Sequence, residues 1–280
     1  MLAYRHAFHA GNHADVLKHV VLTLVLRHMN LKDKPYRLVD THAGAGGYSL
    51  EGRYAQKKGE FEQGIARLWS RDDLPEPVAD YVARVREFNP DGRLTRYPGS
   101  PEFASMLLRP QDQLRLFELH PSDHRILESR FGAARHVEVK NADGFDGLKG
   151  QLPPSTRRAA VLIDPSYEGH GDYGRVVATV RDALQRFAEG VYVVWYPQVR
   201  KVEATHLPRR LVALAPKGWL HARLTVQAPD AQGFGMAGSG VLVINPPYTL
   251  HDRLAEVLPF LTDALGQIGD ANYLLEHRPA

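Results

Sequence analysis

Four residues near the middle of the chain, Asp164-Pro165-Ser166-Tyr167, bring together groups that can hold an exocyclic amino group. The nitrogen of such a group on a nucleobase is a poor nucleophile, because its lone pair is delocalised into the ring. Hydrogen-bond acceptors around the nitrogen favour a tetrahedral arrangement in which the lone pair can attack. The Asp164 carboxylate and the Pro165 carbonyl are suited to this role. The ring of Tyr167 can stack against a base, a contact worth about 1–3 kcal/mol.

This turn differs only at Ser166 from D-P-P-Y, a signature of enzymes that methylate amino groups of nucleobases. Neither acceptor belongs to that side chain, so we expect a less rigid turn with the same chemistry. A closer match in letters, Asn245-Pro246-Pro247-Tyr248, follows the last predicted strand. Because the reactive turn should follow the strand after Asp143, we predict that residues 245–248 form a structural turn into the final helix.

Acidic residues stand at the ends of four consecutive predicted strands, namely Asp40, Glu118, Asp143 and Asp164. Ligands of open α/β sheets bind outside the carboxyl ends of the strands, so these acids predict one cleft. A carboxylate at the position of Glu118 can accept hydrogen bonds from ribose hydroxyls. Asp143, followed by Gly144, can accept one from an adenine amino group.

A glycine-rich turn, DTHAGAGGY at residues 40–48, follows the first of these strands. Gly44 and Gly46 allow a tight turn and a close approach of a ligand to the backbone. The spacing fits S-adenosylmethionine, a nicotinamide nucleotide or a purely structural turn. A dinucleotide fold prefers glycine or alanine where this chain has Ser49, which counts against a nicotinamide-dependent oxidoreductase.

The elements that must position these residues alternate between strands and helices. Strands are predicted at 36–40, 114–119, 136–140, 159–164, 191–196, 221–227 and 240–244. Helices are predicted at 12–30, 59–70, 77–88, 172–187, 202–215 and 251–266. This order predicts an α/β fold with a mostly parallel sheet covered on both faces, whose last two strands are antiparallel. The stretch from Asp40 to Glu118 far exceeds the roughly 30 residues of a strand–helix–strand unit, so it should contain a small helical insertion.

The composition of the 280 residues excludes several classes of protein. There is no cysteine, which rules out disulfides and thiolate chemistry and fits the cytoplasm. The apolar run at 20–26 is far shorter than the roughly 20 residues that span a bilayer, so no membrane segment is expected. No set of metal ligands is complete, and no metal is expected. The net charge of +3 permits an anionic partner. Basic pairs at 157–158, 200–201 and 209–210 flank the proposed cleft in sequence, and together they favour contacts with RNA phosphates.

The chain resembles the bacterial 23S ribosomal RNA adenine(2030)-N6 methyltransferases, the J-type large-subunit enzymes, in YRHAFHAGNHADVLKH, DTHAGAGGY, YPGSP, ELHPSD, ADGF, DPSYE, WYP and INPP. The resemblance covers essentially the whole chain. It implies a Rossmann-like, class I S-adenosylmethionine-dependent methyltransferase with a seven-stranded sheet. The methyltransferase domain would comprise 1–49 and 98–280, with an N-terminal motif at about 1–30 and a helical insertion at 50–97. The implied reaction is N6 methylation of an adenine in 23S ribosomal RNA, by a cytoplasmic monomer that acts before the subunit is fully assembled.

Carried over residue by residue, the resemblance implies a set of cofactor contacts. With Gly44 of the glycine turn added, they are His19, His42, Gly44, Ser100, Glu118, Asp143, Gly144 and Asp164. The implied catalytic residues are Asp164, Pro165, Tyr167 and the supporting Lys18. Tyr4, His6 and Tyr167 would face the RNA substrate. Three alternatives stay open: a DNA adenine-N6 methyltransferase, a nicotinamide-dependent oxidoreductase and a non-catalytic RNA-binding module. The absence of a large target-recognition domain counts against the first.

Overall fold

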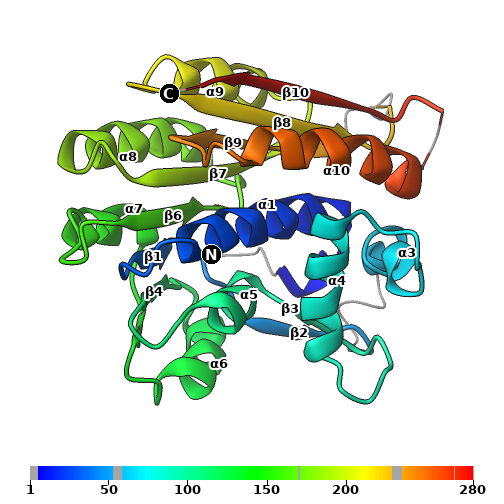
Figure 1. The fold of residues 1–280 in the computed structure, drawn as a ribbon, viewed down its shortest axis with the longest axis horizontal. Helices are drawn as coiled ribbons and strands as arrows, with labels where there is room; N and C mark the ends of the chain where they lie inside the picture. Colours follow the sequence, from blue (N-terminus) through cyan, green and yellow to red (C-terminus); the bar gives the residue numbers. More distant parts are fainter. Residues whose placement is uncertain (1–5, 53–58, 170, 229–234, 268, 280) are drawn as a thin grey trace.

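An eight-stranded sheet runs through the centre of the molecule in the order β10-β8-β9-β7-β6-β1-β4-β5 (Figure 1). The computed structural model describes residues 6–52, 59–169, 171–228, 235–267 and 269–279. The strands are β1 (Arg37–Asp40), β4 (Gln113–Phe117), β5 (Val137–Lys140), β6 (Ala159–Ile163), β7 (Val191–Gln198), β8 (Trp219–Thr225), β9 (Gly238–Ile244) and β10 (Asn272–Arg278). Strands β5, β4, β1, β6 and β7 are parallel, whereas β9, β8 and β10 are paired antiparallel.

The predicted number of seven strands is wrong by one, because β10 follows the final helix and pairs with β8. This edge strand is largely exposed and lacks a continuous apolar face. Its identity therefore depends on backbone pairing with β8, which hydrophobic periodicity does not report.

A second, two-stranded sheet joins β2 (Gly47–Ser49) to β3 (Arg96–Pro98). The pairing of Tyr48 with Tyr97 brings the two ends of the segment 50–97 side by side, as an insertion requires. Whether that segment is a separate subdomain stays a prediction.

The inserted segment contains the 3-10 helix η2 (Glu60–Gln63), α3 (Ala66–Trp69) and α4 (Glu76–Glu87). The helix predicted at 59–70 is therefore two short pieces with Gly64 between them. A Cβ atom at Gly64 would lie 2.1 Å from the carbonyl oxygen of Gly11. The close packing of these two backbones explains why the segment is interrupted here, and it docks the insertion on the N-terminal residues.

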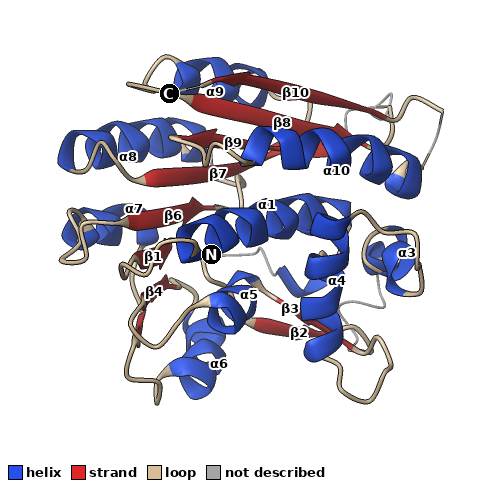
Figure 2. Ribbon diagram, in the orientation of Figure 1, coloured by secondary structure: helices blue, strands red, loops and turns tan. Residues whose placement is uncertain are grey.

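Helices cover both faces of the large sheet, as predicted (Figure 2). One face carries α1 (His13–Asn30), α5 (Ser100–Leu107), α6 (Pro121–Phe131) and α10 (Leu250–Leu265). The other carries α7 (Gly144–Gly147), η3 (Leu148–Gln151), α8 (Asp172–Arg186) and α9 (Val202–Val212). Strand residues alternate between the two hydrophobic cores, with Leu38 in the first and Val39 in the second. No helix in the described ranges is both long and apolar enough to cross a bilayer.

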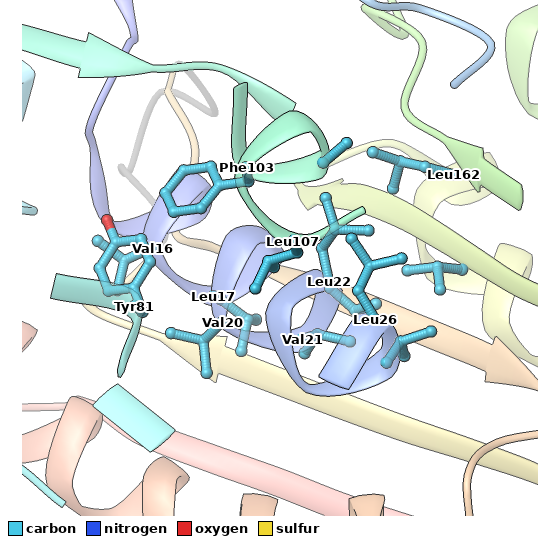
Figure 3. Packing of buried hydrophobic residues seen from close by; sticks show 14 of the residues in the cluster. Val16, Leu17, Val20, Val21, Leu22, Leu26, Tyr81, Phe103, Leu107 and Leu162 are labelled. Atoms are coloured by element: carbon cyan, nitrogen blue, oxygen red, sulfur yellow. The ribbon is translucent and has the colours of Figure 1, made fainter. Parts of the chain in front are cut away.

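Helix α1 is the element that fixes the N-terminal site residues. Asn12 caps it, because its side chain accepts hydrogen bonds from the backbone N–H groups of Ala14 and Asp15, each 3.0 Å long. Figure 3 shows Leu17 and Leu22 of α1 packed among side chains of α4, α5 and β6. Each fully buried leucine or valine stabilises the fold by about 1.5–3 kcal/mol. The helix is therefore a rigid support for the polar side chains at its amino end.

The carboxyl ends of β1, β4, β5 and β6 meet at one edge of the sheet. The chain leaves β1 toward β4 and β5, and then crosses back to β6 on the other side of β1. A crevice forms at such a reversal of strand order and is the usual ligand site of an open α/β sheet. The four acidic residues predicted to share a cleft follow or end these strands.

Candidate active site

The turn that begins at Asp164 follows the last residue of β6, a strand with every residue buried. Tyr167 has a φ of 55°, in the left-handed region that a tyrosine rarely adopts. Its hydroxyl donates a 2.6 Å hydrogen bond to the carbonyl oxygen of Trp195, and its own carbonyl accepts one from Lys201 at 3.3 Å. These contacts to β7 and the residues after it hold the turn without the second proline of D-P-P-Y.

A buried ion-pair network holds the Asp164 carboxylate. Lys18 Nζ lies 2.6 Å from Asp164 Oδ2 and 2.8 Å from Asp15 Oδ1. The other Asp15 oxygen accepts hydrogen bonds from the Gly11 N–H and from His6 Nε2, both at 2.9 Å. Asp15 is thus the residue that joins the N-terminal motif to the reactive turn.

The charges of this network are stabilised by one another. Burial by itself lowers the pKa of Lys18, but the neighbouring carboxylates of Asp15 and Asp164 outweigh burial and hold that pKa above its ordinary value. Burial likewise raises the pKa of Asp15, yet His6 and Lys18 hold it well below its ordinary value. Lys18 is therefore a permanent positive charge beside the Asp164 carboxylate.

Two cavities meet at these residues. His6, Lys18, Asp164 and Ser166 line both of them. The first, which we call the edge cavity, has a volume of about 440 Å³ and lies along the carboxyl ends of β1, β4, β5 and β6. The second, which we call the helix cavity, has a volume of about 520 Å³ and lies between the start of α1, the insertion and β7. Asp164 is thus accessible from both sides.

The edge cavity gathers every residue predicted to contact the cofactor. Its lining includes His19, His42, Gly44, Ser100, Glu118, Asp143, Gly144 and Asp164. These residues come from six separate parts of the chain, and only the fold brings them to one place. Their contacts with a cofactor stay a prediction.

The groups in the edge cavity fit a nucleoside that carries a polar chain. Glu118 accepts hydrogen bonds from the backbone N–H groups of Gly44, at 2.9 Å, and His120, at 2.6 Å, which fixes its carboxylate. His19 shares a 2.8 Å hydrogen bond with the Tyr97 hydroxyl through Nδ1. Its Nε2 is buried and has no hydrogen-bond partner among the described residues. Burial holds the pKa of His19 well below its ordinary value, so a neutral imidazole nitrogen remains for a polar ligand.

Asp143 is held by a partner that the sequence did not reveal. Arg175 of α8 donates a 2.7 Å hydrogen bond to Asp143 Oδ2, while Oδ1 accepts one from the Phe145 N–H at 2.9 Å. Burial raises the pKa of Asp143, but the bond and charge of Arg175 lower it below its ordinary value. No local pattern marks Arg175, whereas the spacing of Asp15 and Lys18, one helical turn apart, is a signal that could have been found.

The helix cavity is lined by aromatic and polar side chains. Trp195, another residue not predicted, lines it together with His6, Tyr167 and Tyr173. The Tyr167 ring is only 2% exposed, with its centroid 4.6 Å from that of Tyr173. Its role in stacking a base stays a prediction, and any such contact uses the part of the ring that borders the cavity. The predicted substrate residue Tyr4 lies outside the described residues.

Two further sequence motifs lie away from both cavities. Strand β9 is antiparallel to β7, so the turn that begins at Asn245 leaves the opposite edge of the sheet. The Asn245 side chain donates hydrogen bonds to the carbonyls of Ala188 and Gly190, at 2.7 and 2.8 Å, which confirms a structural turn before α10. Residues 157–158 flank the cleft in sequence but not in space. Arg158 precedes β6 at the amino edge and bonds to the Met29 carbonyl at 2.9 Å.

The fold and the site define a class of protein. A mostly parallel sheet, a cavity over its carboxyl edge and a D-P-S-Y turn at the wall of that cavity are the features of a Rossmann-like class I methyltransferase.

Comparison with known proteins gives the family. The family model described as "Ribosomal RNA large subunit methyltransferase D, RlmJ" matches residues 33–275. Two proteins named "Ribosomal RNA large subunit methyltransferase J" are similar over nearly their whole length. The one from Escherichia coli K12 is 47% identical over 269 residues, which are 96% of each chain. The one from Haemophilus influenzae is 45% identical over 277 residues, which are 99% of this chain and 98% of that one.

A crystal structure also matches. Protein LPL1258 from Legionella pneumophila is 36% identical, with a TM-score of 0.89 over 96% of this chain and 98% of that chain. The chain therefore belongs to the ribosomal RNA large subunit methyltransferase family described above, and its methyl donor is S-adenosylmethionine. This confirms the resemblance and the fold class, and it sets aside the oxidoreductase alternative.

Proposed function

We propose that this protein methylates the N6-amino group of an adenine in 23S ribosomal RNA, the nucleotide being 2030 by resemblance. The observation that carries the proposal is the position of Asp164 in the wall shared by the edge cavity and the helix cavity. A donor in the first cavity and a base in the second would meet at this carboxylate.

The carboxylate has one oxygen available for the base. Asp164 Oδ2 bonds to Lys18, and among the described residues Asp164 forms no other hydrogen bond. Oδ1 and the Pro165 carbonyl can accept the two N6–H groups of an adenine and localise the nitrogen lone pair. When bound, S-adenosylmethionine supplies the electrophilic methyl group. Such preorganised acceptors in a water-excluded site act without further reorganisation.

Lys18 sets the role of Asp164 in this scheme. A permanent positive charge 2.6 Å from Oδ2 stabilises the ionised carboxylate and fixes its orientation. Asp164 is therefore held as an oriented acceptor of hydrogen bonds. The proton that the amino nitrogen loses after methyl transfer passes to solvent, with Oδ1 holding it only through the hydrogen bond.

The helix cavity supports a nucleobase as the acceptor. Its volume of about 520 Å³ admits a base together with part of its sugar. A base within a duplex must leave the stack to reach such a cavity, so a single-stranded or loop adenine is the cheaper target. Lys201 lines the cavity mouth and adds a positive charge suited to an RNA phosphate.

Methyl transfer from labelled S-adenosylmethionine tests the proposal. The substrates are unmodified 23S RNA, assembled large subunits and duplex DNA, with nucleoside analysis of the product. We expect N6-methyladenosine at one site in the RNA. Label only in DNA would keep the chemistry and overturn the substrate.

Two variants test the assignment of Asp164. Asp164→Asn removes the ionised acceptor and should lower kcat by roughly 10²–10³-fold, the effect of losing one preorganised group. The exposed Asp263 of α10 supplies a matched control, and Asp263→Asn should leave kcat unchanged. Methylation by Asp164→Asn at the rate of the control would contradict the catalytic assignment.

A further inference from the structure

A third cavity, of about 580 Å³, lies between α9 and the outer face of the sheet at β8 and β10. It adjoins the helix cavity, because Pro197, Val199 and Gly235 line both. The consecutive residues Arg200 and Lys201 line the third cavity and the helix cavity, respectively. The two cavities are thus neighbours that share part of their lining.

The third cavity is strongly basic, and we call it the arginine cavity after Arg200, Arg209 and Arg223 in its lining. Among its described lining residues, Glu276 is the only acid. Arg200 and Arg209 are exposed, whereas Arg223 is partly buried. Arg223 Nε is buried without a hydrogen-bond partner among the described residues. A buried guanidinium N–H of this kind is costly unless a ligand accepts its hydrogen bond.

The strand pattern of β8 explains why these groups share one face. Alternate residues of a strand point to the same side, so His221 and Arg223 face the cavity while Leu220, Ala222 and Leu224 enter the opposite core. Leu274 of β10 is the neighbour of Arg223 in register and supplies no charge to neutralise it. The fold therefore holds a positive charge at the floor of a cavity that two further arginines border.

We propose that the arginine cavity holds the RNA strand adjacent to the target adenine, with its phosphates contacting Arg200, Arg209 and Arg223. This inference rests on the proposed function. A base placed in the helix cavity leaves its own backbone at the cavity mouth, and the next phosphates must follow the surface from there. The arginine cavity is contiguous with that mouth and complementary in charge. Arginine also suits phosphate oxygens, because its planar guanidinium can donate two parallel hydrogen bonds.

The test measures binding of an unmodified 23S RNA transcript at a series of potassium chloride concentrations, together with KM and kcat for methyl transfer. For single strands, each phosphate contact contributes about 0.7 to the slope of log affinity against log salt. Arg209→Ala should therefore reduce the slope by about 0.7. It should also raise KM roughly 3- to 10-fold with kcat unchanged, because the residue does not touch the reacting atoms.

Three further variants complete the test. Arg209→Lys keeps the charge and should retain the slope. Arg223→Lys tests the contribution of the partly buried arginine while keeping a positive charge at that position. The matched control is Arg135→Ala, an exposed arginine just before β5 at the other end of the sheet, which should change neither quantity. Thermal unfolding of each variant shows whether the fold is intact.

The outcomes separate this inference from the proposed function. A slope that Arg209→Ala leaves unchanged, or that Arg135→Ala reduces equally, overturns the inference. If Arg209→Ala reduces the slope by about 0.7 and the wild-type protein methylates no RNA, the proposed function fails and the arginine cavity stands as an RNA-binding site.

Discussion

Replacing Lys18 by methionine should destabilise the protein severely and abolish its activity. The substitution keeps an unbranched apolar stem of nearly the same length and removes the ammonium group with its charge and its hydrogen bonds. In the wild-type structure, the ammonium group is almost completely buried and joins Asp15 at 2.8 Å to Asp164 at 2.6 Å. The variant leaves two carboxylates facing one another without a counter-charge.

The magnitude follows from the burial of each partner. The Asp15 side chain is 2% exposed and that of Asp164 13% exposed, so water can replace little of the lost interaction. Removing one member of a buried ion pair costs about 3–5 kcal/mol, because the partner charge stays buried. Asp15 keeps its bonds to His6 and Gly11, so we expect the lower half of that range for the free energy of unfolding. Lys149→Met, which removes an exposed ion pair with Asp146, should cost less than about 1 kcal/mol.

Urea denaturation at several pH values measures the loss of stability in Lys18→Met. The direction in which this loss changes with pH follows from the pKa of Asp15. In the wild-type protein the pKa of Asp15 lies well below its ordinary value of 3.8, so its contribution to stability is present above that pH and is lost as pH falls through the lowered pKa. Without Lys18 that pKa must rise. The destabilisation should therefore shrink as the pH falls through the raised pKa of Asp15 in the variant, because protonation removes the uncompensated charge.

A double variant distinguishes stability from positioning. Lys18→Met with Asp15→Asn removes the uncompensated charge and should recover about half of the lost stability. Its kcat should stay low, because Asp164 still lacks the cation that orients it. A cost below about 1 kcal/mol for Lys18→Met, or full activity in the double variant, would refute the reasoning.

Two other perturbations probe residues in or next to the edge cavity, namely Gly144 in its lining and Asp40, which accepts a hydrogen bond from Ser100 of the lining. Burial raises the pKa of Asp40 from 3.8 to about 6, so the folded protein binds this proton more tightly than the unfolded chain and loses stability as pH rises from about 4 to 6. Asp40→Asn should abolish this loss of about 3 kcal/mol. Urea denaturation would then show a difference in the free energy of unfolding between the wild-type protein and the variant that changes with pH. A difference that stays constant with pH would contradict the prediction. Gly144→Ala would place its Cβ 1.8 Å from the Thr41 carbonyl oxygen. We expect this substitution to lower the free energy of unfolding by at least about 2 kcal/mol, as measured by thermal unfolding. We also expect weaker binding of the cofactor, as measured by calorimetry. Wild-type values of both quantities would show that the backbone relaxes freely around the added methyl group.

Much of the fold follows from patterns that are local in the sequence. The apolar spacing of α1 and its Asn12 cap define that helix within one residue of its observed start. Three of the four acids predicted to share a cleft, Glu118, Asp143 and Asp164, line the edge cavity, because parallel strands share their carboxyl edge. The fourth, Asp40, is buried and accepts a hydrogen bond from Ser100, so its predicted place in the cleft is wrong. The order of the motifs also separated the turn at Asp164 from the closer letter match at Asn245, since only one follows a parallel strand of that edge.

The tertiary structure alone decided which side chains meet. Lys18 and Asp164 are 146 positions apart, and their ion pair depends on α1 crossing the sheet beside β6. Arg175 reaches Asp143 only because α8 packs beside α7, and Arg158 turns to the amino edge because it precedes β6. Strand β10 exists through backbone pairing with β8. Periodicity reports which face of an element is buried, whereas these contacts depend on the distance and orientation between elements, which no local pattern contains.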